Sequence, residues 1–189
     1  MEKNNFSLLR SKEIIAILDG DKDFGELTFE DKYGNETKIK IAMPYLSGPA
    51  ICELSSFFGL PATYSWSGGA LSRWQYFDNI MAFCIKQNRM SDFLSYLFSK
   101  DKFVDVLRDL SVKDIQSAHE AILQKVLEQI NSILYFGGHE LRAIGKVYQV
   151  CNVGEVVAVA APAVKIIDRA YIKDLAGRAN KDIDEGNFD

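Results

Sequence analysis

Cysteine, histidine and long apolar runs are all scarce in this sequence. Its 189 residues include two histidines and three widely separated cysteines, Cys52, Cys84 and Cys151. An odd number of scattered cysteines argues against a disulfide framework and is typical of a reducing compartment, so we expect a cytoplasmic protein. No segment approaches the roughly 18 consecutive apolar residues that span a membrane, and the first residues lack the layout of a secretory signal. We therefore expect no membrane partner.

Strong charge of one sign is also absent. The chain has 22 Lys and Arg residues against 26 Asp and Glu residues, which gives a formal net charge of -4. Because nucleic-acid binding is driven mainly by basic groups on phosphates, this balance argues against a dedicated DNA or RNA binder. A local basic patch stays open, since net charge says nothing about distribution. The content of 48% hydrophobic and 25% charged residues is that of an ordinary globular protein.

What the sequence does contain is helical periodicity. It predicts an α+β fold, a predominantly helical bundle with two small antiparallel β-hairpins and six or seven helices in all. We expect helices at about 6–18, 47–58, 71–98 (in two pieces), 103–107, 111–134 and 168–184, and hairpins at 26–43 and 140–153. One mixed domain would span 1–165, followed by a connecting helix at 166–189. The residues expected in the core are Trp74, Phe77, Phe93, Ile122, Val126 and Ile130.

Motifs that mark catalysis or metal binding are missing. No HExxH, CxxC or GxSxG spacing occurs, and no complete phosphate-binding loop. We therefore expect a non-enzymatic protein with no catalytic residue, no metal and no cofactor. His119 lies one position off the apolar stripe of the long helix, which predicts a surface or rim position. Asp19, Asp21 and Asp23 lack the spacing of a calcium loop and indicate a solvated acidic loop.

Four residues are candidate contacts for a ligand or partner: Arg73, His139, Arg142 and Lys146. Arg73 follows Gly68-Gly69 at a helix start, where backbone N–H groups can hold an anion; the alternative is a surface arginine that stacks on an aromatic ring. His139 follows two glycines just past the long helix, and the alternative there is a turn residue bonded to backbone.

Two other functions stay open. A helix cluster followed by a β-ribbon is the order of a winged helix-turn-helix module, in which Arg142 and Lys146 would join Lys38 and Lys40 as a basic face. The outer face of the long helix is charge-neutral, however. The second alternative is a metal-dependent enzyme that uses His139 with nearby acids.

Three segments carry a resemblance to a known family. They are Leu-Ser-Gly-Pro-Ala-Ile at 46–51, Ser-Arg-Trp at 72–74, and the closing stretch with Ile-Ile-Asp-Arg-Ala-Tyr-Ile at 166–172 and Lys-Asp-Ile-Asp-Glu-Gly-Asn-Phe-Asp at 181–189. They resemble the N-terminal region of bacterial abortive-infection proteins of the AbiJ type. In that family a comparable tail leads into a C-terminal all-helical domain of the HEPN class, often a ribonuclease.

The resemblance implies a bacterial protein of antiviral defence and phage resistance, whose N-terminal domain senses infection or regulates the C-terminal effector. The expected partner is that effector domain or another protein. A homo-oligomer is an alternative, because the last predicted helix has an apolar edge at Ile172, Leu175 and Ile183. Neither histidine is preceded by the closely spaced arginine of HEPN ribonucleases, which agrees with an effector that begins after Asp189. No catalytic residue is carried over.

Overall fold

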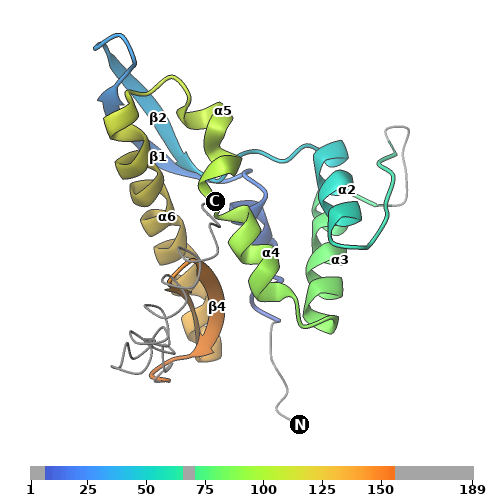
Figure 1. The fold of residues 1–189 in the computed structure, drawn as a ribbon. Helices are drawn as coiled ribbons and strands as arrows, with labels where there is room; N and C mark the ends of the chain where they lie inside the picture. Colours follow the sequence, from blue (N-terminus) through green and yellow to red (C-terminus); the bar gives the residue numbers. More distant parts are fainter. Residues whose placement is uncertain (1–6, 66–70, 156–189) are drawn as a thin grey trace, which may run out of the picture. The chain divides into compact units, whose positions relative to one another are not determined.

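The computed structural model describes residues 7–65 and 71–155, all within a compact unit that spans Met1–Val156. These residues form six α-helices, two short 3₁₀ helices and two separate antiparallel hairpins, β1–β2 and β3–β4 (Figure 1). The predicted α+β class, helical with two small hairpins, is confirmed. The predicted helix at 168–184 and the connecting segment 166–189 lie outside the described residues, so the domain boundary at 165 stays a prediction.

The first helices begin at serine caps. Helix α1 (Lys12–Leu18) follows Ser11, whose Oγ accepts a hydrogen bond from the backbone N–H of Ile14 at 3.3 Å. Helix α2 (Gly48–Phe57) follows Ser47 in the same way and has a proline in its first turn, as the Ser-Gly-Pro sequence predicts.

The remaining helices follow the predicted pieces. Helix α3 (Arg73–Lys86) and helix α4 (Met90–Leu97) are separated by the short interruption at 87–89. The 3₁₀ helix η1 (Lys100–Phe103) and helix α5 (Val104–Leu107) then lead to the 23-residue helix α6 (Val112–Leu134) and the 3₁₀ helix η2 (Tyr135–Gly137). At the start of α6, the Ser111 hydroxyl donates to the carboxylate of Asp114 at 2.7 Å.

The first hairpin consists of β1 (Asp23–Glu30) and β2 (Glu36–Ala42). Leu27 lies opposite Ile39 on one face, and Thr28 lies opposite Lys38 on the other. This alternation leaves one face apolar, and both strands contact α6. Strand β1 begins earlier than predicted because the register is irregular between Asp23 and Glu26, which the period-two pattern does not reveal.

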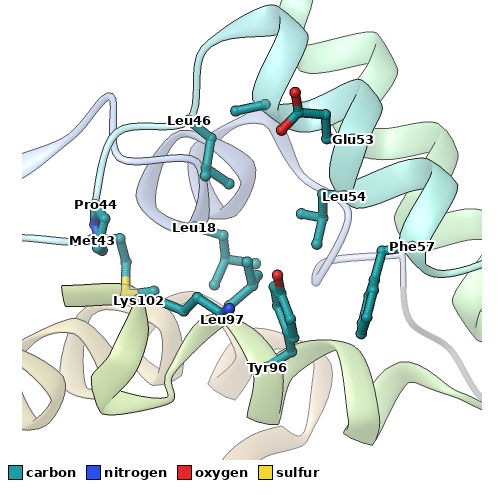
Figure 2. Close-up of a pocket in the computed structure, with 11 residues that line it drawn as sticks. Leu18, Met43, Pro44, Leu46, Glu53, Leu54, Phe57, Tyr96, Leu97 and Lys102 are labelled. Atoms are coloured by element: carbon teal, nitrogen blue, oxygen red, sulfur yellow. The ribbon is translucent and has the colours of Figure 1, made fainter. Parts of the chain in front are cut away.

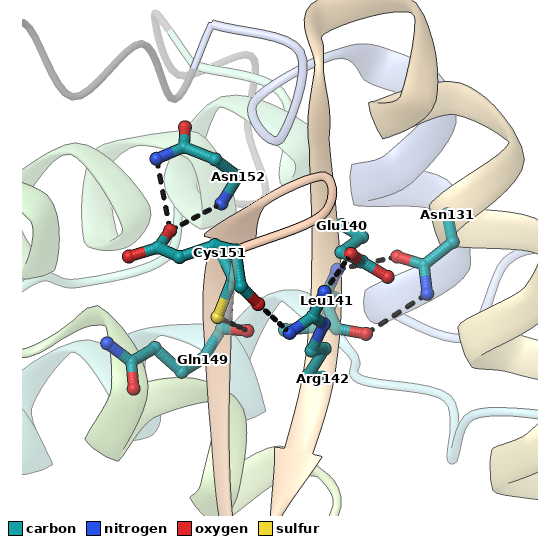
Figure 3. Close-up of polar contacts among 8 residues, drawn as sticks. Asn131, Glu140, Leu141, Arg142, Gln149, Cys151 and Asn152 are labelled. Atoms are coloured by element: carbon teal, nitrogen blue, oxygen red, sulfur yellow. Dashed lines mark hydrogen bonds and ion pairs between the residues drawn. The ribbon is translucent and has the colours of Figure 1, made fainter. Parts of the chain in front are cut away.

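The second hairpin, β3 (His139–Ile144) and β4 (Val147–Asn152), has both outer edges covered by side chains from helices. The Asn131 amide of α6 donates to the carbonyl of Leu141 at 3.0 Å and accepts from its N–H at 2.6 Å (Figure 3). On the β4 edge, Ser91 donates to the carbonyl of Tyr148 at 2.7 Å and Ser95 accepts from its N–H at 2.9 Å. These contacts fix the hairpin against α6 and α4 and cover backbone groups that would otherwise be free to pair with another strand.

The core lies between α6, the hairpins and the other helices. Five of the six predicted core residues are fully buried: Phe77, Phe93, Ile122, Val126 and Ile130. The prediction for Trp74 is wrong. This residue is only half-buried because it lies in the first turn of α3 near the surface, where the Lys12 ammonium is 4.7 Å from its ring centre.

Candidate functional site

An apolar groove of about 370 Å³ lies between α2 and α4. One wall is a single face of α2, formed by Ala50, Glu53, Leu54 and Phe57 at the i, i+3, i+4, i+7 spacing of one helix side. The side of α2 that carries Ile51 is buried in the core. The helix therefore contributes Ile51 to the core and Ala50, Glu53 and Phe57 to the groove, and Leu54 belongs to both.

The other walls come from α1, from α4 and from the segment that leads into α2. Tyr96 and Leu97 of α4 face α2, and Leu18 of α1 lies between the two helices (Figure 2). Met43 and Pro44, just after β2, close another side. Three separate parts of the chain must therefore fold together before this groove exists.

Phe57 is the most prominent apolar group at the groove. Its side chain is 64% exposed, although its ring centre is 5.0 Å from that of Tyr96 and 5.2 Å from that of the buried Phe58. Phe58 in turn packs edge-on against Phe93 in the core, at 5.3 Å between ring centres. Because these ring contacts already restrict the Phe57 side chain, covering it should cost less conformational entropy than covering a ring without neighbours.

Two charged residues line the groove, and they differ in their surroundings. The Lys102 ammonium lies 3.8 Å from the ring centre of Tyr96 and 2.9 Å from the carboxylate of Asp101. Partial burial works against the charged form, but hydrogen bonds to Tyr96 and Asp101 raise the pKa of Lys102. The Glu53 carboxylate has no hydrogen bond or ion pair with any residue that the structure describes.

Arg73, the first of the predicted contact residues, is engaged inside the fold. Its Nη1 donates to the carbonyl of Leu46 at 2.6 Å, its Nη2 lies 3.0 Å from Oδ2 of Asp19, and its guanidinium is 4.7 Å from the ring centre of Tyr45. It also pairs with Asp21. Gly68 and Gly69, the glycines of the predicted anion loop, lie outside the described residues.

The sequence predicts that the acidic loop beside Arg73 is solvated, but for Asp19 this prediction is wrong. The Asp19 side chain is only 1% exposed, because it lies under the Arg73 guanidinium. Burial raises the pKa of Asp19, and the positive charge of Arg73 opposes that rise. The cluster is a link between the end of α1 and the start of α3.

The other three predicted contact residues lie on the second hairpin. His139 is the half-buried first residue of β3, and Lys146 is exposed in the turn. Arg142 pairs with Glu140 at 2.5 Å and donates to the carbonyl of Glu155 at 2.6 Å (Figure 3). None of the groups that Arg73 contacts belongs to this hairpin, so the four predicted residues fall into two separate groups.

Neither alternative function gains a site in the described residues. Lys38 is paired with Glu26 at 3.7 Å and Lys40 with Asp23 at 3.5 Å, so the first hairpin has a mixed surface rather than a basic face. Within residues 7–65 and 71–155, no three His, Cys, Asp or Glu side chains are grouped to hold a metal ion. The basic face and the metal cluster that these alternatives require are therefore not formed there.

The sequence predicts a surface or rim position for His119, and this prediction is wrong: the residue is buried, at 8% exposure. Its Nε2 lies 3.1 Å from the carbonyl oxygen of Phe98, and its ring packs edge-on against Phe103 at 4.8 Å between centres. A carbonyl only accepts, so Nε2 carries the proton. The three cysteines are free and buried, and burial raises the pKa of Cys84 to about 11, far from the range of a reactive thiolate.

Sequence reasoning did not find the groove. The signal that was present is the apolar residue Phe57, which extends the apolar surface of α2 beyond the buried Ile51 and Leu54. A ten-residue helix with apolar groups on two sides requires either deep burial or a binding face. Only the tertiary structure shows that Phe57 remains exposed.

One family model matches part of the chain, that of the fungal ubiquitin-associated domain, at residues 78–130. The matched segment begins within α3, includes α4 and α5, and ends within α6. It covers less than a third of the sequence and includes the α4 wall of the groove. No curated protein and no solved structure matches the chain. None of the helices formed by the described residues is long and apolar enough to cross a membrane.

This comparison overturns the resemblance to bacterial abortive-infection proteins of the AbiJ type. The matching family is fungal and ubiquitin-associated, and the segments that carried the resemblance, at 46–51, 72–74 and 166–189, all lie outside the match. The expectations of phage resistance, antiviral defence and control of a C-terminal effector are therefore wrong. Short identities in a helix start and a charged tail are easily shared by unrelated proteins, because capping and solubility impose the same residues.

Proposed function

We propose that this chain is a non-catalytic protein-binding module, and that its groove between α2 and α4 takes an apolar surface of ubiquitin. The observation that carries the proposal is the exposed ring of Phe57, in contact with Tyr96 and Phe58, beside an apolar groove. Exposed apolar surface that is rimmed by polar groups is typical of protein interaction sites.

The family match supports the choice of partner. The matched family is named for its association with ubiquitin, and residues 78–130 supply Tyr96, Leu97 and Lys102 to the groove. The α2 wall comes from outside the match. The proposed site therefore combines one wall from the matched segment with a second wall specific to this chain.

The residues most often used in catalysis support a non-catalytic role. His119 is buried against a backbone carbonyl, and burial raises the pKa of all three cysteine thiols. A cytoplasmic location is part of the proposal, since a reducing compartment keeps such thiols free.

The proposal is tested by titrating ¹⁵N-labelled ubiquitin with the full chain and following its amide resonances. We expect saturable shifts in one contiguous patch of ubiquitin. The variant Phe57→Ala should weaken binding about tenfold, which corresponds to about 1.4 kcal/mol, because an ordered aromatic anchor is lost. Absence of shifts at millimolar concentration would exclude ubiquitin as the partner.

The matched control is Tyr33→Ala. Tyr33 is 78% exposed in the turn between β1 and β2, so its removal tests exposed aromatic surface away from the groove. We expect unchanged ubiquitin affinity. Equal losses in both variants would show that binding does not use the groove. A second copy of the chain could occupy the groove instead of ubiquitin. Sedimentation of the free chain tests this, because a dimer held by the groove should dissociate in the Phe57→Ala variant.

A further inference from the structure

We infer that the segment received by the groove carries a lysine or arginine next to its apolar anchor, and that Glu53 pairs with this basic group. The inference rests on the proposed role of the groove as a protein-binding site. It adds the charge of the partner's contact segment, which the family match does not specify.

Glu53 lies on the α2 face that lines the groove, between Ala50 and Phe57. It also borders a second, shallower hollow on the other side of α2, which Pro49 and Thr63 help to line. A protein that covers Phe57 must therefore pass over or beside this carboxylate.

The two charged side chains at the groove have different surroundings. Lys102 is neutralised by Asp101 and covered by the ring of Tyr96. Glu53 has no such partner in the described part of the chain. Lys102 and Glu53 lie on opposite walls of the groove (Figure 2). The net unpaired charge at the groove is thus negative, and it favours a partner with positive charge.

The spacing of Glu53 and Phe57 sets the spacing in the partner. Residues four apart on a helix have Cβ atoms about 5–6 Å apart. In the partner, a basic residue and an apolar anchor at the same separation would occupy positions i and i+3 or i+4 of a helix. In a strand, which rises about 3.3 Å per residue, they would occupy positions i and i+2. When apolar contacts around the pair exclude water, the attraction between the charges strengthens.

The test is selection from a phage-displayed library of random twelve-residue peptides on the full chain. We expect sequences with an aromatic or aliphatic residue and a Lys or Arg two to four positions away. Selection on Glu53→Lys should replace the basic residue by Asp or Glu. Selection on the control Glu36→Lys should leave the basic preference intact, because Glu36 is an exposed carboxylate in the first hairpin, opposite Glu30.

One selected peptide is then measured against point variants. Glu53→Gln should weaken it about two- to fivefold, the range of an exposed ion pair, and Glu36→Gln should leave it unchanged. Thermal unfolding of each variant confirms that the fold is retained. A peptide set without basic bias, a bias that survives Glu53→Lys, or equal affinity for Glu53→Gln overturns the inference.

The outcomes distinguish failure of the groove as a binding site from failure of the role of Glu53. If the selected peptides bind Phe57→Ala as well as the wild type, the groove is not the site and both fail. If they require Phe57 but lack a basic residue, only the role of Glu53 fails. If they require both while ubiquitin causes no shifts, the groove and its charge preference stand and only ubiquitin is excluded.

Discussion

At the scale of single residues, His119 makes stability depend on pH. Burial lowers the pKa of His119; the hydrogen bond to Phe98 and the charge of Glu120 oppose that shift, whereas Lys100 adds to it. Below about pH 6.5, the ordinary value, the unfolded chain binds a proton that the folded chain does not. The stabilising effect of the neutral ring is therefore complete above that pH and is lost as the pH falls through the folded pKa.

We expect the free energy of unfolding to decrease between pH 7.5 and pH 5.5 by more in the wild type than in His119→Gln, whose amide can still donate to the Phe98 carbonyl. The difference is at most about 1.4 kcal/mol per pH unit for one proton. Urea unfolding at several pH values measures both curves. Parallel curves would show that His119 titrates normally in the folded protein.

A second residue-scale prediction concerns Arg73. Its removal in Arg73→Ala leaves Asp19, which is only 1% exposed, without its countercharge. Because an uncompensated buried charge is costly, we expect a loss of about 3–5 kcal/mol in chemical denaturation.

Arg10→Ala is the control for Arg73→Ala, since it breaks an ion pair with Asp78 at 2.7 Å whose arginine is 38% exposed. Such a pair contributes about 1 kcal/mol or less. Equal losses in the two variants would mean that burial of Asp19 does not decide the cost.

At the scale of elements, Gly20 determines how the end of α1 meets the segment before α2. It has φ +80°, and a Cβ there would lie 2.6 Å from the carbonyl oxygen of Pro44 and from Cα of Tyr45. Gly34 in the first hairpin turn has a similar φ of +84° but open space around it. A side chain at Gly34 would therefore meet backbone strain alone, whereas a side chain at Gly20 would meet backbone strain and a collision with the main chain.

We expect Gly34→Ala to lose about 1–2 kcal/mol of stability, the cost of the left-handed conformation alone. Gly20→Ala should lose distinctly more, because the main chain of 44–45 must move as well. Thermal or urea unfolding of both variants measures the difference. A loss at Gly20 no greater than at Gly34 would show that this segment yields freely.

At the scale of the whole molecule, the segment that matches the ubiquitin-associated family is not an independent unit. The buried residues form one continuous core that joins α1, β2 and α2 to α3, α4 and α6. Ile14, Ile51 and Leu141 belong to this core but lie outside residues 78–130. Excision of the matched segment would therefore expose the faces that they cover.

We expect the isolated segment 78–130 to lack a cooperative thermal transition, while the full chain unfolds cooperatively. Circular dichroism with temperature distinguishes the two cases. The full chain with Phe57→Ala serves as the control, since loss of an exposed ring should leave its cooperativity unchanged. A sharp transition in the segment would show that it folds alone and that the rest of the chain is an addition.

The sequence by itself determined most of the secondary structure of the described residues, because its causes are local. Ser47 with Pro49 gave the start of α2, the alternation around Leu27 and Ile39 gave the first hairpin, and periodic apolar residues such as Ile122 gave α6. Burial on the main stripe of the long helices was predictable for Phe77, Ile122, Val126 and Ile130 but not for Trp74 at the start of α3.

The tertiary structure decided which polar and aromatic groups were enclosed. Asp19 and His119 are buried because Arg73 and the Phe98 carbonyl, both distant in sequence, happen to meet them. Phe57 lines a groove because Tyr96 of α4 approaches one side of its ring, and the rest of the ring stays exposed because no described segment covers it. Burial of a polar group and exposure of an apolar one depend on contacts between remote segments, and periodicity along one segment carries no information about those contacts.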